Sequence, residues 1–218
     1  MSSLFSTVIE YPESDGKPMG ETDLHRDAMV RHIEILKQYY RGQDVYVSGD
    51  LLLYYEKGNP KKFVVPDAFI AKGNKQFQRR TYRLWDEGVV PQLVIETTSK
   101  KTKKRDLTIK PVIYAQIGVK EYFMFDPTRD YLEPPLQGKR LIECVYQAIE
   151  SEADGSLFSE ELGLRLAFDE GELAFIRPKT GERLLSAEEE LVVQSEAKRA
   201  LEIENERLRQ QLRKLQGD

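Results

Sequence analysis

The chain has 218 residues, enough for one ordinary domain with an appendage or for two small domains. Its 40% hydrophobic and 32% charged residues are typical of a globular protein and exclude wholesale disorder and a membrane-spanning architecture. A single cysteine, Cys144, excludes a disulfide framework and a cysteine-cluster zinc site, and the first residues lack the pattern of a secretory signal, so we expect a cytoplasmic protein with no membrane partner.

The net charge of -4 hides a division of charge along the chain. Residues 57–120 hold 15 Lys and Arg against 5 Asp and Glu, whereas residues 121–190 hold 7 against 17. Such a basic segment can attract a polyanion even when the whole molecule is anionic. A well-solvated surface produces the same pattern, so the charge division alone does not choose between the two interpretations.

The predicted elements begin after an irregular lead-in over residues 1–20, which is rich in proline and glycine. Apolar residues at helical spacing predict a helix over 24–41, with Thr22 or Asp23 as the N-cap and Gly42 as the stop. Strands are predicted over 45–55, 63–71, 90–96, 122–125, 140–149, 162–168 and 172–177, and a second helix over 103–117. This order predicts an α/β domain over 21–185 with a mixed β-sheet flanked by helices.

The C-terminal segment, residues 186–218, differs in kind because it is long, charged and free of glycine and proline up to Leu215. Ser186 and Glu189 have the spacing of a capping box, which predicts one long helix. Leu201, Leu208 and Leu215 recur every seven residues and place Asn205 at a core position, as in a short coiled coil. We therefore predict a homodimer through this helix, although a helix that packs on its own domain or frays fits the same pattern.

Two carboxylates stand where apolar strands disfavour charge: Asp67 within VVPDAFIA and Glu96 at the end of LVIE. Asp and Glu are almost never fully buried unless they are paired or bind a metal. Oxygen ligands favour Mg²⁺ or Mn²⁺ over zinc. The sequence therefore indicates a shared divalent cation, with pairing to nearby lysines or projection into solvent as the open alternative.

A basic segment follows Glu96 directly, with five cations in the six residues from Lys100 to Arg105. At the mouth of a metal site, such a run would hold phosphates by charge, without reading sequence. A second basic segment covers residues 72–83. The candidate nucleic-acid-binding residues are Arg79, Arg80, Lys100, Lys101, Lys103, Lys104 and Arg105; a solvated loop is the alternative interpretation of such a run.

These residues resemble a PD-(D/E)XK nuclease and, more closely, the Uma-type family of restriction-endonuclease-like proteins. The resemblance extends from ETDLHRDAMV through VVPDAFIA, LVIETTSKKT, Asp106, Lys110 and Tyr114 to GVKEYFMFDP, DGSLFSEELGL and the charged C-terminal helix. It implies a restriction-endonuclease-like fold whose acidic residues lie on neighbouring central strands.

The resemblance also implies roles for individual residues. Asp67 and Glu96 correspond to the acidic positions of the motif and, with a main-chain carbonyl near Thr97, would bind Mg²⁺. Thr98 stands where the motif has lysine, and the family pattern assigns that function to Lys110 on the following helix.

Two points about the site stay open in the sequence. Pro111 means that the helix either starts near Thr108 or kinks beside Lys110, and Lys100 and Lys101 are substitutes for Lys110. The superfamily often adds an acidic residue from its first helix or strand, which makes His25, Glu34 and Asp50 possible additional site residues. His25 and His32 share a face of the first helix, where a structural role is the common one.

The leading hypothesis is an enzyme, a Mg²⁺-dependent endodeoxyribonuclease that hydrolyses DNA phosphodiester bonds, with Asp67, Glu96 and Lys110 as its catalytic residues. The alternative is a catalytically inactive nuclease-fold protein that acts as a nucleic-acid-binding or coiled-coil interaction module. Thr98 and Pro111 favour this alternative. A coiled-coil adaptor that binds protein is a third possibility and predicts no salt-dependent affinity for DNA.

Overall fold

The computed structural model describes residues 9–16 and 22–216, and residues 1–8 and 17–20 of the predicted lead-in lie outside this part. Residues 9–16 have no regular secondary structure. The chain divides into two compact units, Met1–Leu184 and Leu185–Asp218. Each unit is described by itself.

The first unit begins with helix α1, Asp23–Tyr39. The Thr22 side chain accepts a hydrogen bond from the main-chain N–H of His25 at 3.3 Å, which is the N-cap geometry that the sequence predicts. Ile35 and Leu36 lie on the buried face of the helix. The helix therefore begins and packs as its capping residue and apolar spacing indicate.

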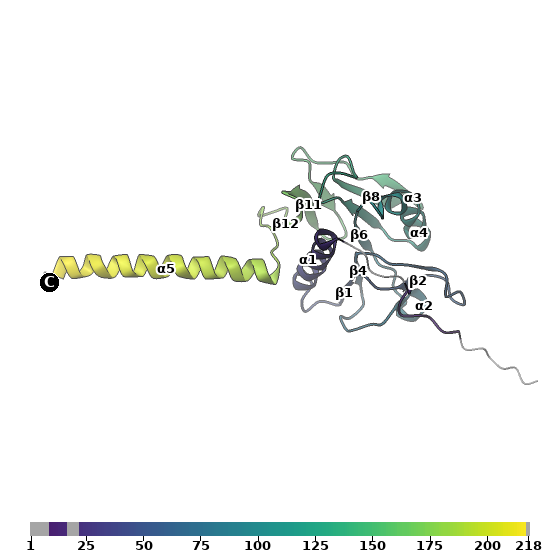
Figure 1. The fold of residues 1–218 in the computed structure, drawn as a ribbon, viewed down its shortest axis with the longest axis horizontal. Coiled ribbons are helices and arrows are strands. Elements are labelled where there is room, and N and C mark those ends of the chain that lie inside the picture. The colour runs from purple at the N-terminus through teal and green to yellow at the C-terminus, as the bar shows by residue number, and fades with distance from the viewer. Residues whose placement is uncertain (1–8, 17–21, 217–218) are drawn as a thin grey trace, which may run out of the picture. The chain divides into compact units, whose positions relative to one another are not determined.

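A six-stranded mixed sheet forms the centre of the first unit (Figure 1). Its strand order is β1-β4-β6-β7-β8-β9, and β6 and β7 form the one parallel pair among its described strands, joined by the crossover through α3 and α4. These elements are β1 (Val45–Ser48), β4 (Ala68–Lys72), β6 (Leu93–Thr97), α3 (Lys103–Thr108), α4 (Lys110–Ile117), β7 (Glu121–Phe125), β8 (Leu136–Ile142) and β9 (Val145–Ala148). The predicted architecture, a mixed sheet flanked by helices, is confirmed.

Alternate residues of the central strands enter two different hydrophobic clusters, one on each face of the sheet. On β6, Leu93 and Ile95 pack with α1, whereas Val94 packs with Tyr114 of α4. Because side chains alternate along a strand, Glu96 falls on the face that α4 covers. This alternation determines which helix can reach the carboxylate.

Two three-stranded sheets complete the first unit. One has the order β10-β11-β12 and contributes to the same cluster as α1, and the other has the order β3-β2-β5 and contributes to the same cluster as α4. The elements are β2 (Leu53–Tyr54), β3 (Phe63–Val64), β5 (Tyr82–Arg83), α2 (Leu84–Glu87), β10 (Leu157–Ser159), β11 (Leu164–Asp169) and β12 (Glu172–Ile176). Both faces of the central sheet are thus covered.

Four predicted elements are divided in the structure. The strand predicted over 140–149 falls on the end of β8 and on β9, with a turn at Glu143 and Cys144 between them. The strand predicted over 45–55 forms β1 and β2, and the one predicted over 63–71 is interrupted at Pro66 and Asp67 between β3 and β4. The helix predicted over 103–117 is two helices that meet at Ile109, and Pro111 lies in the first turn of the second, where its missing N–H costs nothing. Gly118, at φ 89°, ends α4 as predicted.

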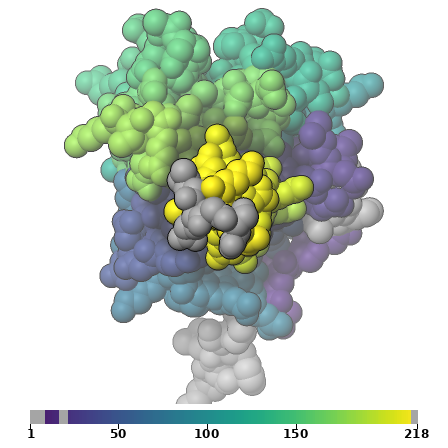
Figure 2. Space-filling model, turned by 90° about the vertical axis from the view of Figure 1, so that its left-hand side faces the viewer, coloured from purple at the N-terminus to yellow at the C-terminus, as the bar shows by residue number. Residues whose placement is uncertain are grey.

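The second unit contains helix α5, Ala187–Gln216, seen end on in yellow in Figure 2. The Ser186 N–H donates to Glu189 Oε2 at 2.5 Å, and the Glu189 N–H donates to Ser186 Oγ at 3.2 Å. These two hydrogen bonds form the predicted capping box. No helix within the described residues has the length and apolar character needed to cross a membrane.

Candidate active site

The ends of β4 and β6 bring Asp67 and Glu96 together. The antiparallel register pairs Ala68 with Ile95, and one further step places Asp67 opposite Glu96. The main-chain N–H of Asp67 lies 3.3 Å from Glu96 Oε2 and donates to it. The two carboxylates predicted to form the site are therefore neighbours.

The Glu96 side chain is completely buried, and each of its oxygens accepts a hydrogen bond from α4. Lys110 Nζ donates to Oε2 at 2.6 Å, and the Tyr114 hydroxyl donates to Oε1 at 2.6 Å. Lys110 and Tyr114 are four residues apart and share one face of α4. Helix α4 thus brings both a lysine and a tyrosine to Glu96.

Asp67 is the more accessible of the two carboxylates, with 14% of its side chain exposed. Its Oδ2 accepts a hydrogen bond of 2.7 Å from the Thr97 main-chain N–H. His25 Nε2, from the first turns of α1, lies 3.4 Å from the same oxygen. Asp67 is therefore the carboxylate of the pair that solvent can reach.

A third carboxylate, Asp106 of α3, contacts the same lysine, Lys110. Its Oδ1 is 3.1 Å from Lys110 Nζ, and its side chain is completely buried. The Tyr122 hydroxyl of β7 donates to the Asp106 main-chain oxygen at 2.8 Å. Asp67, Glu96, Asp106, Lys110 and Tyr114 are called the carboxylate–lysine cluster below.

The electrostatics of the cluster follow from burial and from the excess of carboxylates. Burial raises the pKa of Glu96 well above its usual value; Lys110 opposes this shift, and Asp67 adds to it. Burial also acts to raise the pKa of Asp67, but Lys110, His25 and the Thr97 N–H outweigh it and hold that pKa below its usual value. The two carboxyl groups therefore differ in proton affinity.

Lys110 and Tyr114 respond to the same field. Burial acts to lower the pKa of Lys110, but Glu96, Asp67 and Asp106 outweigh it and raise that pKa above its usual value. Burial and Glu96 together raise the pKa of Tyr114 well above its usual value. At neutral pH the cluster therefore holds a protonated lysine and a protonated tyrosine, both donating to Glu96.

Comparison with known proteins gives the family. The sequence model of the Uma2 family, described as "Putative restriction endonuclease", matches residues 9–174, which include every member of the cluster. The chain belongs to the Uma2 family. No curated protein matches the sequence.

One solved structure similar to this Uma2 protein is the crystal structure of a putative nuclease belonging to DUF820 from Anabaena variabilis ATCC 29413. The TM-score is 0.49 and the sequence identity 14%, over 71% of this chain and 83% of that chain.

The cluster of this Uma2 protein fits a divalent cation by the chemistry of its donors. The Glu96 and Asp106 carboxylates contact the Lys110 ammonium group, and the Asp67 carboxylate lies beside Glu96, so carboxyl groups outnumber ammonium groups here and a bound cation would favour their ionised forms. Within residues 9–16 and 22–216, no group of three or more His, Cys, Asp or Glu side chains is arranged to hold a metal ion. Asp67 and Glu96 would therefore need main-chain and water oxygens as further ligands, which is how Mg²⁺ is commonly bound.

The basic run beside the cluster is accessible. Lys100, Lys101, Lys103, Lys104 and Arg105 are all exposed, on the turn after β6 and on α3. These five residues are called the basic run below. They follow Glu96 by only a few residues, so positive charge adjoins the carboxylates at this end of β6.

The side chain of Arg79, a candidate nucleic-acid-binding residue, is buried in the structure although an exposed one was expected. Its side chain is only 4% exposed, Nε donates to Glu87 at 2.8 Å, and the guanidinium lies over the Tyr46 ring at 3.9 Å. An arginine held in this way contributes to the packing of the domain, and its guanidinium group is less accessible to a phosphate than that of an exposed arginine. Arg80, in contrast, is 83% exposed.

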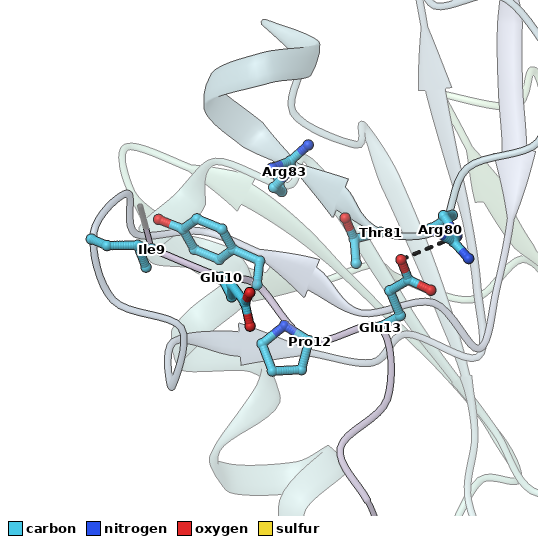
Figure 3. Close-up of a pocket in the computed structure, with 8 residues that line it drawn as sticks. Ile9, Glu10, Pro12, Glu13, Arg80, Thr81 and Arg83 are labelled. Atoms are coloured by element: carbon cyan, nitrogen blue, oxygen red, sulfur yellow. Dashed lines mark ion pairs between the residues drawn. The ribbon is translucent and has the colours of Figure 1, made fainter. Parts of the chain in front are cut away.

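A surface pocket lies between the lead-in and the β5 region (Figure 3). It is lined by Ile9, Glu10, Tyr11, Pro12, Glu13, Arg80, Thr81 and Arg83, and none of these belongs to the carboxylate–lysine cluster. Arg80 Nε lies 3.1 Å from Glu13 Oε1, and Arg83 Nε lies 2.9 Å from Asp86. The two arginines of the pocket are therefore each paired with a carboxylate.

The structure brings together some of the possible additional residues and not others. His25 lies beside Asp67, and Asp50, although exposed, adjoins the same segment through its main-chain N–H, which donates to the Pro66 carbonyl at 2.9 Å. Glu34 is exposed on α1. Asp106 and Tyr114 join the cluster although no role was predicted for either of them. The sequence contained a signal for them: residues 106, 110 and 114 are spaced by four, which would place them on one face of the single helix predicted over 103–117.

Proposed function

We propose that this protein is a metal-dependent endonuclease that hydrolyses DNA phosphodiester bonds at the carboxylate–lysine cluster. The observation that carries the proposal is the contact of Lys110 with Glu96 at 2.6 Å, beside Asp67. It unites two acidic residues on neighbouring strands with a lysine, the residue set of the nuclease superfamily that the sequence resembles. Membership in a family described as "Putative restriction endonuclease" supports the same conclusion.

Each residue of the cluster has a distinct part in the proposed reaction. Asp67 and Glu96, with a main-chain carbonyl near Thr97, would hold Mg²⁺ or Mn²⁺, which when bound supplies Lewis-acid activation of water and of the scissile phosphate. Lys110 places a positive charge at the carboxylates, where it can orient the attacking water or stabilise charge that develops on the phosphate. The basic run, with Arg80, would hold the DNA backbone.

The test is cleavage of supercoiled and linear DNA by the full chain with Mg²⁺, Mn²⁺ or EDTA. We expect metal-dependent cleavage that EDTA abolishes, and a loss of about a hundredfold or more in Asp67→Asn, Glu96→Gln and Lys110→Met. Glu150→Gln is the matched control, because Glu150 is an exposed carboxylate outside the cluster. Circular dichroism spectra and melting curves check that each variant folds.

Absence of cleavage by the wild type under all these conditions would overturn the proposal. If salt-dependent DNA binding then persisted, the inactive nuclease-fold hypothesis would take its place. If neither activity appeared, a protein-binding adaptor would be the remaining function.

We further propose that α5 pairs with α5 of a second copy as a parallel coiled coil. Leu201, Leu208 and Leu212 are 46–65% exposed, and with Asn205 they occupy the inner positions of the heptad pattern. In a parallel pair, Glu204 of one helix and Arg209 of the other occupy positions that attract each other. An antiparallel pair would place Asn205 against leucine, which disfavours that arrangement.

Sedimentation equilibrium of the full chain tests the dimer. We expect a dimer that Leu208→Lys weakens at least about tenfold in Kd, because a charge enters the helix interface. Ile203→Lys is the control, since Ile203 is 63% exposed and lies on the outer face of the heptad. A monomeric wild type at micromolar concentration would contradict the proposal.

A further inference from the structure

Lys110 lies on helix α4 and extends its long side chain to Glu96 on the sheet, so we asked which other residue holds its ammonium group in place. A lysine side chain has four rotatable bonds, and ordering it costs conformational entropy. A second carboxylate oxygen, Asp106 Oδ1, lies 3.1 Å from the same Nζ. Lys110 is therefore held between two carboxylates, Glu96 on the strand and Asp106 on α3.

Asp106 has few other contacts that would explain its burial. Its side chain is completely buried, and within the described residues neither carboxylate oxygen has a hydrogen bond of good geometry. A buried carboxylate is costly unless it is paired. The ion pair with Lys110 is the interaction that compensates this cost.

The main chain at Asp106 is anchored to the central sheet. The Tyr122 hydroxyl of β7 donates to the Asp106 carbonyl at 2.8 Å, and Tyr122 itself is buried against Tyr114. The helix breaks at Ile109, between Asp106 and Lys110, so the ion pair spans the junction of α3 and α4. Asp106 can thus fix the position of the Lys110 side chain relative to β7 as well as relative to α3.

We infer that Asp106 is a positioning residue, which holds the Lys110 ammonium against Glu96 in place of a lysine on the strand itself. This inference rests on the proposed function for its effect on cleavage, whereas its effect on the lysine is independent of that function. Asp106 touches neither DNA nor metal in this role. It acts through Lys110 alone.

Nitrogen-15 spectra of the Lys110 side chain test the positioning directly in the full chain without metal. The ammonium signal is assigned by its loss in Lys110→Met. We expect a resolved signal in the wild type, loss or strong broadening in Asp106→Asn, and recovery in Asp106→Glu. A signal in Asp106→Asn identical to that of the wild type would overturn the inference, even if the protein cleaved no DNA.

Cleavage kinetics provide the second readout. We expect Asp106→Asn to lower kcat about 10- to 100-fold with KM for DNA changed less than about threefold, because a group that orients another acts in the chemical step. In a Lys110→Met background the same substitution should have no further effect on kcat. An undiminished kcat in Asp106→Asn, or additive losses in the double variant, would contradict the inference.

Asp126 supplies a matched control. It is as deeply buried as Asp106, but its carboxylate accepts hydrogen bonds from Thr128, Tyr131 and Leu132 in its own loop. Asp126→Asn is expected to lower the melting temperature while leaving the Lys110 signal and kcat unchanged. If Asp126→Asn altered both readouts as Asp106→Asn does, the effect would be general destabilisation and the inference would fail.

Discussion

At the scale of single residues, His32 makes the stability of the protein depend on pH. Its imidazole is buried between the rings of Phe125 and Phe175, and Nδ1 has no hydrogen-bond partner within the described residues. Burial lowers the pKa of His32 from 6.5 to about 3, Arg31 and His25 add to this effect, and Asp67 opposes it. The folded protein therefore keeps His32 neutral at pH values where the unfolded chain is protonated.

The sign of the resulting pH dependence follows from linkage. The pKa of His32 is lower in the folded protein than in the unfolded chain, so the unfolded chain takes up a proton first as the pH falls. The favourable effect of neutral His32 on the free energy of unfolding is therefore fully present above pH 6.5. It is lost as the pH falls from 6.5 toward 3, by up to about 1.4 kcal/mol per pH unit. We expect His32→Gln to flatten the fall of the unfolding free energy over this range, measured by urea titration at each pH. Parallel curves for the variant and the wild type would show that His32 makes no such contribution.

The residues of the site show what a sequence can and cannot predict. Asp67 and Glu96 stand out because each places a charge at the end of an apolar strand, and the register brings them together as expected. The hydrogen bond from Tyr114 to Glu96 was not predicted, because it depends on how α4 docks on the sheet. A charge at the end of an apolar strand is visible in the sequence itself, whereas the docking of a helix on a sheet depends on contacts between separate elements.

At the scale of elements, the strand boundaries were predicted least well where the chain bends. Residues 45–55 and 63–71 read as continuous strands from their apolar content, yet Pro66 and Asp67 interrupt the second one. β10 has only three residues, Leu157–Ser159, too few for an alternating pattern to appear. The long periodic helices α1 and α5, in contrast, follow their predicted ranges and caps closely.

Gly49 is the residue that permits the close crossing beside Asp67. A Cβ atom at Gly49 would lie 1.9 Å from the Asp67 carbonyl oxygen, and the neighbouring Asp50 N–H donates to the Pro66 carbonyl at 2.9 Å. We expect Gly49→Ala to lower the unfolding free energy by about 1–3 kcal/mol, because the main chain at Asp67 must move. Urea unfolding measures this loss, and Mn²⁺ titration reports any displacement of Asp67.

Ser48→Ala is the control for this substitution, since it changes the adjacent position without adding an atom. It should alter the unfolding free energy by far less than Gly49→Ala does. Equal stability of Gly49→Ala and the wild type would mean that the crossing tolerates a methyl group and that the segment is not tightly packed.

At the scale of the whole molecule, the division of charge is partly internal to the fold. Lys72 and Lys120, from the basic part of the sequence, both pair with Glu161 from the acidic part, at 3.2 and 3.1 Å. Arg79 is likewise engaged with Glu87. The net charge of a segment therefore overstates the charge available to a ligand, and the basic run is the concentrated part that stays accessible.

The salt dependence of DNA binding separates a local contact from the general field. If the basic run contacts phosphates, Lys100→Gln/Lys103→Gln/Lys104→Gln should reduce the slope of log K against log salt by about 0.9 for each phosphate that the protein no longer neutralises. The matched variant Lys57→Gln/Lys61→Gln/Lys62→Gln removes the same charge from exposed positions in another part of the fold. Long-range attraction depends on the total charge of the protein, whereas counterion release depends on the phosphates that are neutralised by direct contact. The slopes of log K against log salt for the two triple variants should therefore differ by about 1 to 3. Equal slopes for the two triple variants would mean that DNA binding depends only on the net charge of the protein. The basic run would then make no direct phosphate contacts beside Glu96.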